Sequence, residues 1–224
     1  MCIRDRDITG TILSKCPVTA SQEDLCALLP KLTGEIEQIP PMYSAVKVDG
    51  RKLYQLAREG KEIERKPRTV TIYQLSLLGT GEREHEYCLD VSCSKGTYIR
   101  SLCEEIGQQL GCGAVLTELI RTKACGFSLS ECLTFEQVEQ AVSEGIIEEK
   151  IFPVERVFNP YPRVDLTEQT ARLFFNGVKL DPERLGIIQK AEYYRVYTPR
   201  REFAALAYID AENLFRVKKI FVLQ

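Results

Sequence analysis

A tyrosine in a proline-stiffened segment is the first candidate for chemistry. Residues 39–45 have the sequence Ile-Pro-Pro-Met-Tyr-Ser-Ala. Two consecutive prolines hold the backbone extended, so Tyr43 stands on a stiff support. A ring displayed in this way suits base stacking, which contributes about 1–3 kcal/mol per base in proteins that bind single-stranded nucleic acid. The alternative is a core tyrosine that anchors the Pro-Pro segment, and the residues alone leave both interpretations open.

Cations surround the tight turn that follows. The pair Asp49-Gly50 is typical of a turn, and Lys47, Arg51 and Lys52 flank it. Lysine and arginine side chains bind phosphates and position a nucleic acid without reading its sequence. A solvated turn that carries the same charges is the other interpretation.

A third candidate lies at a predicted strand-to-helix junction. Residues 93–100 have the sequence Cys-Ser-Lys-Gly-Thr-Tyr-Ile-Arg, in which we expect Thr97 to cap the helix. Arg100 then falls in the first helical turn, where the helix dipole disfavours a cation. An arginine in that position needs a carboxylate or phosphate partner. The segment lacks the glycine and lysine spacing of a nucleotide-binding P-loop.

Small residues dominate the fourth segment, residues 110–122. Gly111 and Gly113 allow a close approach of backbone or ligand. Leu119, farther along, either packs on a ligand or fills the core, and a core position is the default for leucine.

The cysteine and histidine pattern argues against a metal site. The chain has nine Cys and one His, and no two cysteines have Cys-x-x-Cys spacing, so we expect no zinc-type centre. His85 lies in the polar run 81–86, which predicts an exposed hairpin tip. Cysteines such as Cys26 and Cys103 occur within apolar patterns, which is typical of reduced thiols used as small hydrophobic side chains in a cytoplasmic protein.

Composition indicates a globular protein with uneven charge. The 224 residues are 44% hydrophobic and 28% charged, with a net charge of −2, and no stretch has the ~20 apolar residues that a membrane span needs. Residues 41–68 hold eight Lys/Arg against four Asp/Glu, whereas residues 129–155 hold seven Glu and one Lys. These are either two functional surfaces of opposite sign or two solvated faces.

Periodicity and turn residues predict the elements that position these segments. Strands are expected at 8–16, 45–48, 70–78, 87–93, one or two within 115–127, and 193–198, 203–209 and 214–222. Helices are expected at 19–29, 52–59, 99–110, after a Thr134 cap, and at 167–175. The fold class is therefore α+β, with a mainly antiparallel sheet flanked by helices and a small β-rich C-terminal part. Residues 159–162, Asn-Pro-Tyr-Pro, are the predicted linker between domains at 1–158 and 159–224.

In this order the four segments resemble the TruB family of tRNA pseudouridine synthases. The resemblance rests on residues 34–45, 47–60, 93–100 and 110–122, and it runs from about residue 7 to about residue 157. It implies a pseudouridine synthase fold and the isomerisation of one uridine in the T-arm loop of tRNA to pseudouridine, without cofactor or metal. Residues from about 160 resemble the small PUA-type RNA-binding β-barrel that the family carries at its C-terminus. We expect a monomer with tRNA as partner.

The resemblance also implies a role for each matching residue. Tyr43 is the tyrosine that stacks on the flipped-out uracil. Tyr98 is the second tyrosine behind it, Arg100 is the partner of the catalytic carboxylate, and Leu119 is an apolar wall of the base pocket. Lys47 and Lys52 are expected to bind the RNA substrate.

One family feature has no counterpart in these residues. The family's catalytic aspartate lies in a Gly-His-Thr-Gly-x-Leu-Asp-Pro stretch, and nothing like it occurs here. The chain instead joins the family pattern near residues 7–10, after six residues that match neither that pattern nor a natural leader. We therefore expect a catalytic domain without its nucleophile segment, inactive by itself, and neither Asp5, Asp7 nor Asp49 is expected to replace the missing residue.

Two alternatives of other classes stay open at this point. One is an RNA-binding protein without catalysis that holds or refolds tRNA. The other is a scaffold that uses the acidic stretch 129–155 to bind a protein.

Overall fold

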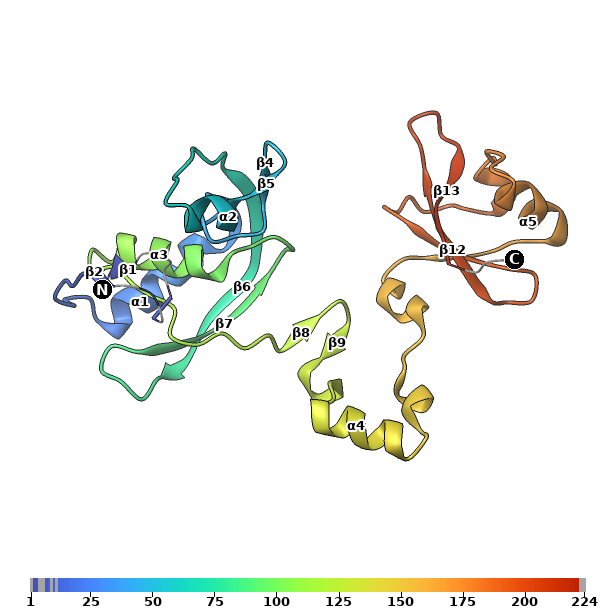
Figure 1. The fold of residues 1–224 in the computed structure, drawn as a ribbon. Helices are drawn as coiled ribbons and strands as arrows, with labels where there is room; N and C mark the ends of the chain where they lie inside the picture. The colour runs from blue at the N-terminus through green and yellow to red at the C-terminus, as the bar shows by residue number, and fades with distance from the viewer. Residues whose placement is uncertain (1, 4–6, 9, 11, 222–224) are drawn as a thin grey trace. The chain divides into compact units, whose positions relative to one another are not determined.

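Backbone contacts divide the chain into two units, Met1–Ile120 and Arg121–Gln224, which we describe one at a time. The computed structural model describes residues 2–3, 7–8, 10 and 12–221 (Figure 1). Within these residues no helix is both long and apolar enough to cross a bilayer.

The first unit is built on a three-stranded antiparallel sheet of order β3-β6-β7. Its elements are β1 (Cys2–Ile3), β2 (Ile12–Ser14), α1 (Gln22–Leu28), a 3-10 turn (Leu29–Leu32), β3 (Gly34–Gln38), β4 (Lys47–Val48), β5 (Arg51–Lys52), α2 (Leu53–Arg58), β6 (Arg68–Thr80), β7 (Tyr87–Cys93) and α3 (Ile99–Gln109). The predicted strand at 8–16 is confirmed only over β2, and positions 9 and 11 lie outside the described residues.

Helices α1 and α3 cover one face of this sheet (Figure 1). Leu25 of α1, Leu102 and Ile106 of α3, and Ile72 and Leu75 of β6 are buried against one another. Because side chains alternate between the faces of a strand, the opposite face of the sheet carries Tyr73, which is 63% exposed, and other solvated residues. The apolar periods read from the sequence therefore fix which face of the sheet is covered.

Gly107 in α3 allows the backbone of residues 112–114 to pass close to the helix. A Cβ at Gly107 would lie 2.1 Å from the backbone nitrogen of Ala114. The Gly107 carbonyl accepts hydrogen bonds from the backbone N–H groups of Cys112 and Gly113, at 3.2 and 2.9 Å. The predicted close approach in residues 110–114 is thus present.

The second unit consists of a helical stretch and a four-stranded sheet. Its elements are β8 (Lys123–Ala124), β9 (Phe127–Ser128), α4 (Phe135–Ser143), β10 (Arg163–Asp165), α5 (Glu168–Phe175), β11 (Tyr194–Tyr197), β12 (Phe203–Ile209) and β13 (Phe215–Ile220), with 3-10 turns at Leu129–Glu131, Ile147–Lys150, Val154–Phe158 and Glu183–Leu185. The predicted capping box of α4 is confirmed, because Thr134 Oγ1 accepts a hydrogen bond from the backbone N–H of Gln137.

The C-terminal sheet has the order β10-β11-β12-β13, in which only the first pair is parallel. Phe174 of α5 packs on Tyr194 and Phe215 in a core where all three are at most 1% exposed. Among the described residues β10 and β13 stay at opposite edges, so the closed barrel expected for this region is not confirmed. The α+β class with mainly antiparallel strands is confirmed.

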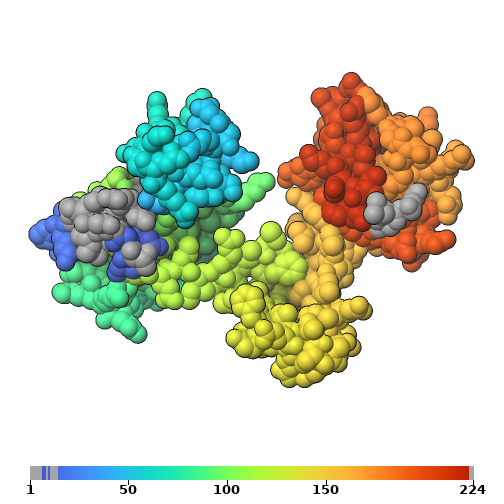
Figure 2. Space-filling view, viewed as in Figure 1, coloured from blue at the N-terminus to red at the C-terminus, as the bar shows by residue number. Residues whose placement is uncertain are grey.

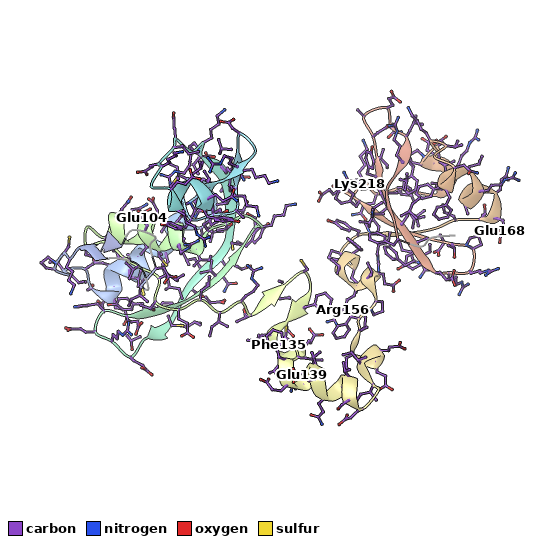
Figure 3. All side chains as sticks on the ribbon, in the orientation of Figure 1. Glu104, Phe135, Glu139, Arg156, Glu168 and Lys218 are labelled. Atoms are coloured by element: carbon purple, nitrogen blue, oxygen red, sulfur yellow. The ribbon has the colours of Figure 1, made fainter. Side chains whose placement is uncertain are left out.

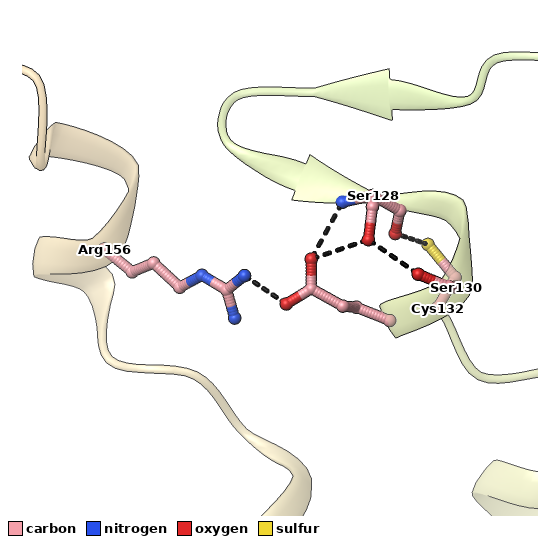
Figure 4. Close-up of polar contacts among 5 residues, drawn as sticks. Ser128, Ser130, Cys132 and Arg156 are labelled. Atoms are coloured by element: carbon pink, nitrogen blue, oxygen red, sulfur yellow. Dashed lines mark hydrogen bonds and ion pairs between the residues drawn. The ribbon is translucent and has the colours of Figure 1, made fainter.

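Arg156 connects the hairpin β8–β9 to the segment that precedes the four-stranded sheet. The Arg156 guanidinium lies 4.5 Å from the ring centre of Phe127 and 4.1 Å from that of Phe152, and it forms an ion pair with Glu131 (Figures 3 and 4). Glu131 also accepts hydrogen bonds from the backbone N–H and the hydroxyl of Ser128, at 2.9 and 2.8 Å. These contacts hold pieces of the chain that lack a large apolar core.

The predicted linker at 159–162 packs on the sheet that follows it. Arg195 Nε donates a hydrogen bond to the Tyr161 carbonyl at 2.9 Å, and its Nη1 donates to Asn159 Oδ1 at 2.8 Å. The domain boundary at 158/159 stays a prediction.

The structure corrects four expectations. Strands β3 and β10 were not expected, because Glu-Ile-Glu and Arg-Val-Asp carry few strand-forming residues. The N-cap of α3 is Tyr98 and not Thr97, whose hydroxyl donates instead to the Ser94 carbonyl at 2.8 Å.

Cys26 is exposed, so it is no part of the core, whereas Cys103 is partly buried as expected. His85 lies in the exposed β6–β7 turn, as predicted.

Candidate functional site

A buried glutamine joins β3 to the start of α3. Gln38 is 6% exposed, and its side-chain Nε2 donates to the Tyr98 carbonyl at 3.1 Å while its Oε1 accepts from the Tyr98 N–H at 2.7 Å. Tyr98 has no side-chain cap of its own. The amide is therefore the partner of the Tyr98 N–H, and it adds a bond to a carbonyl that already accepts from the N–H groups of Ser101 and Leu102, at 3.0 and 3.1 Å.

Side chains from α3 and from the loop before β6 bind carbonyls of the proline segment. Pro40 and Pro41 have no N–H to donate, so these two residues can form hydrogen bonds only through their carbonyls. The donors are Ser101 Oγ to Ile39 at 3.3 Å, Arg65 Nη1 to Pro40 at 3.2 Å, and Arg100 Nη2 to Tyr43 at 2.8 Å. The segment that carries Tyr43 is thus fixed without being a helix or a strand.

Arg100 brings together two predicted site residues that lie 57 positions apart in the sequence. It occupies the first turn of α3, as predicted, and its bond to the Tyr43 carbonyl offsets part of the unfavourable dipole there. Within the described residues, no carboxylate lies within 4.0 Å of its guanidinium. Arg100 and the ring of Tyr43 are both partly exposed, so a ligand can reach them.

Next to Tyr43 lies a hydroxyl that sequence reasoning missed. Ser44 is 5% exposed, and its Oγ has no hydrogen-bond partner in the part of the chain that the structure describes. A buried polar atom without a partner costs about 1–3 kcal/mol, so such atoms are rare unless another group binds them. Gln38, Arg65 and Ser101 were missed as well, because nothing local in the sequence marks the residues that hold a loop from a distance.

The basic hairpin has the predicted tight turn. Asp49 and Gly50 have φ angles of 49° and 80°, a left-handed pair that favours glycine at the second position. The register places Lys47 directly opposite Lys52, and like charges so placed destabilise a strand pair. Arg51 differs from the prediction because it already forms an ion pair with Glu59.

The hairpin β4–β5 and helix α2 form a projection on the first unit (Figure 2). Two of its cations lie close to the ring of Tyr54. Lys52 Nζ lies 5.5 Å and the Arg58 guanidinium 5.4 Å from the centre of its ring. Hydrogen bonds from Arg51 and Lys61 lower the pKa of the Glu59 carboxyl, which therefore stays ionised at neutral pH. Lys47 and Lys52 remain the cations here that an anion would neutralise most favourably.

Leu119 is 59% exposed and is not a core residue. It follows Leu116, whose carbonyl accepts from the Ile8 N–H at 2.9 Å and whose backbone bridges to Asp7. No described contact joins Leu119 to Tyr43 or Arg100. The exposure excludes the default interpretation of a buried leucine, while its place in a base pocket stays a prediction.

The described residues contain no group of three or more His, Cys, Asp or Glu side chains that could hold a metal ion. Burial raises the pKa of the Cys103 thiol to about 11, so this thiol is protonated at neutral pH and is a poor nucleophile.

Comparison with known proteins identifies the family. The family model for the N-terminal domain of TruB family pseudouridylate synthases matches residues 3–99, and the model for the C-terminal domain of tRNA pseudouridylate synthase B matches residues 100–159. The chain belongs to the TruB family. A protein named tRNA pseudouridine synthase B from Stutzerimonas stutzeri is 45% identical over 218 residues, covering 96% of this chain and 70% of that protein.

The matches to other TruB relatives cover a smaller share of those relatives' length. The protein of the same name from Pseudomonas fluorescens is 42% identical over 84% of this chain, but over only 63% of its own length. The chain thus spans about two thirds of the curated relatives it matches. Among solved structures, a Cbf5-Nop10-Gar1 complex contains a chain that matches with a TM-score of 0.68 and 23% identity, over 93% of this chain and 64% of that one. This likeness supports the pseudouridine synthase fold seen here.

Proposed function

We propose that this TruB chain, together with a segment that carries the family's catalytic aspartate, isomerises a uridine in the T-arm loop of tRNA to pseudouridine, and that the 224 residues alone do not. The observation that supports it best is the hydrogen bond from Arg100 to the Tyr43 carbonyl. This bond brings an aromatic ring and a cation without a described carboxylate partner together on a rigid support. The reaction breaks the N1–C1′ bond of the uridine and forms a C5–C1′ bond. C5 releases its hydrogen as a proton to the solvent, and N1 takes up a proton, so the base keeps its composition.

Each residue has a role in this proposal. Tyr43 stacks on the uracil that is flipped out of the loop, and Tyr98 lies behind it. Arg100 pairs with the catalytic carboxylate, which the family carries in its Gly-His-Thr-Gly-x-Leu-Asp-Pro stretch. Leu119 forms an apolar wall of the base pocket.

The basic hairpin supplies the contacts to the RNA backbone. A phosphate placed between Lys47 and Lys52 would relieve the repulsion of two like charges that face each other across the strand pair. Residues 159–224 would act as a PUA-like module with a barrel-type sheet that binds RNA. We place the protein in the cytoplasm as a monomer with tRNA as its partner.

Release of tritium from tRNA labelled at uracil C5 tests the reaction. A designed N-terminal segment with the Gly-His-Thr-Gly-x-Leu-Asp-Pro stretch is fused in front of the 224 residues, and a matched version has Asn in place of that aspartate. We expect release only from the first, while both bind a T-arm stem-loop equally. Equal release from the two versions would show that another carboxylate does the chemistry. Binding without any release would favour an RNA-binding protein that does not catalyse.

Substitutions in the active fusion test the assigned roles. Tyr43→Ala should lower kcat/KM by roughly 5- to 150-fold, the equivalent of about 1–3 kcal/mol of stacking. Lys47→Gln should reduce the slope of log K against log salt by about one, because one phosphate contact is lost. The matched control is Lys66→Gln, a cation beyond the hairpin in the same basic segment. Equal effects of Lys47→Gln and Lys66→Gln would contradict the hairpin's role.

A further inference from the structure

A hollow of about 490 Å³ lies in the second unit, beside β10 and the turn between β11 and β12. The residues that line it are Arg163, Asp165, Leu166, Thr198, Pro199 and Arg201. Two of them are cations and one is an acid, so the lining has a net positive charge. The function proposed above gives RNA binding to this part of the chain without assigning it to any residue.

Arg163 is held in place on one side of the hollow. Its guanidinium lies 3.8 Å from the ring centre of Tyr197. Its Nε donates to both oxygens of Asp165, at 3.0 and 2.9 Å, and its Nη2 donates to one of them at 2.5 Å. This fixed geometry leaves Nη1 as the donor that the Asp165 contacts do not use. An arginine oriented in this way loses little entropy when it binds an anion.

Arg201 faces the hollow from a turn with an unusual backbone. Its φ angle is 62°, a left-handed conformation that is uncommon for residues other than glycine, and its N–H donates to the Thr198 carbonyl at 2.8 Å. Strained residues of this kind cluster at ligand-binding sites. Within the described residues, no carboxylate lies within 4.0 Å of the Arg201 side chain.

Thr198 adds a hydroxyl to the same lining. Its Oγ1 accepts a hydrogen bond from the Glu202 N–H at 3.2 Å. A hydroxyl that accepts one bond still has its own proton to donate. The hollow therefore combines a fixed guanidinium, a second guanidinium and a hydroxyl, which together suit the oxygens of a phosphate.

We propose that this hollow binds a phosphate of the RNA backbone, between Arg163 Nη1, Arg201 and Thr198 Oγ1. The proposal rests on the proposed function for the class of its ligand. A backbone contact is favoured over base recognition because the ring of Tyr197 is 4% exposed and covered by Arg163, so the lining offers no open ring for stacking. Asp165 pairs with Arg163, so Arg201 supplies the cation of the lining that has no described carboxylate partner.

Two neighbouring arginines give a matched experiment. Arg201 lines the hollow and Arg200 does not, although both are exposed on the same turn. The variants are Arg201→Asn, Arg200→Asn and Arg201→Lys, and asparagine tolerates the left-handed backbone at position 201. Binding of an unmodified tRNA transcript is measured over a range of salt concentrations, and thermal unfolding confirms that each variant is folded.

We expect Arg201→Asn to weaken tRNA binding several-fold and to lower the slope of log K against log salt by about one. Arg200→Asn should leave the slope unchanged, and Arg201→Lys should restore it. If tRNA binds but Arg201→Asn and Arg200→Asn behave alike, the hollow is not the site while the proposed function stands. If the unaltered chain binds neither tRNA nor a T-arm stem-loop, both the hollow and the proposed function are wrong.

Discussion

Residues 38–46 and residues 129–157 are ordered in opposite ways. The first segment has almost no regular structure, yet Gln38, Pro40, Pro41 and Ser44 are buried and distant side chains bind its carbonyls. The second contains α4 and three 3-10 turns, yet Ala141 is its only buried residue, all of its residues being described. Regular secondary structure is therefore a poor guide to how firmly this chain is held. Contacts from distant residues decide that instead.

The largest expected difference between the two segments lies in the cost of removing one polar side chain. Gln38→Leu leaves the Tyr98 N–H without a partner and removes one of the bonds to the Tyr98 carbonyl, which still accepts from the Leu102 N–H. We therefore expect the free energy of unfolding to fall by about 2–3 kcal/mol. The matched change in the second segment is Thr134→Ala, which removes only the exposed cap of α4 and should cost about 1 kcal/mol.

Urea unfolding of both variants measures the two costs on the same scale. Gln38→Glu serves as a further control, because it keeps the shape and one acceptor but loses the donor to the Tyr98 carbonyl. Its cost at neutral pH should be at least that of Gln38→Leu, because one oxygen of a buried carboxylate would then face the Tyr98 carbonyl oxygen. Equal costs for Gln38→Leu and Thr134→Ala would mean that the bonds to Tyr98 contribute no more than a helix cap.

The same contrast explains what the sequence could and could not reveal. The Asp49-Gly50 turn and the Thr134–Gln137 capping box depend on residues at most three positions apart, and both are present as predicted. The Gln38–Tyr98 contact joins residues 60 positions apart, and no local pattern marks it. Thr97 is not the N-cap, and α3 instead begins after Tyr98, whose N–H is bound by the distant Gln38 amide.

For the candidate site, family resemblance supplied what local patterns left open. Residue types alone allowed Tyr43 to be a core residue and Lys52 to be a solvated charge. The structure adds that Arg100 binds the Tyr43 backbone, that Leu119 is exposed, and that Arg51 is already paired. None of these follows from spacing, because each depends on how α3, β5 and α2 pack in three dimensions.

Thiol reactivity offers a second test of the contrast. Burial raises the pKa of Cys103 on α3 to about 11, whereas Cys125 and Cys132 near the second segment are exposed. At pH 8 the thiolate fraction of Cys103 should be lower by roughly 100-fold than that of an ordinary exposed cysteine, and alkylation should slow in proportion. Iodoacetamide labelling followed by peptide mass spectrometry measures the rates. Labelling of Cys103 as fast as that of Cys125 would mean that α3 is no better held than the hairpin β8–β9.

The smallest expected effect concerns the one strong polar contact of the second segment, that between Glu131 and Arg156. The pKa of Glu131 is lowered to about 2, first by the hydrogen bond from the Ser128 N–H and next by the one from Arg156. A carboxyl whose pKa falls on folding adds stability that is complete above its ordinary value of 4.5 and is lost as the pH falls toward 2. The link between the hairpin and Arg156 should therefore weaken only in acid.

Arg156→Gln should raise the pKa of Glu131 but leave it below 4.5, because the Ser128 N–H still binds the carboxylate. A carbon-13 NMR titration of the Glu131 carboxyl measures this pKa directly. Lys150→Gln is the control, since it removes a cation of the same segment that makes no described contact with Glu131. If Arg156→Gln leaves the pKa of Glu131 unchanged, the guanidinium is held by the rings of Phe127 and Phe152 alone. Residues 129–157 would then be held to Arg156 through its ring contacts only. The contrast with the hydrogen-bonded proline segment would be larger than the structure indicates.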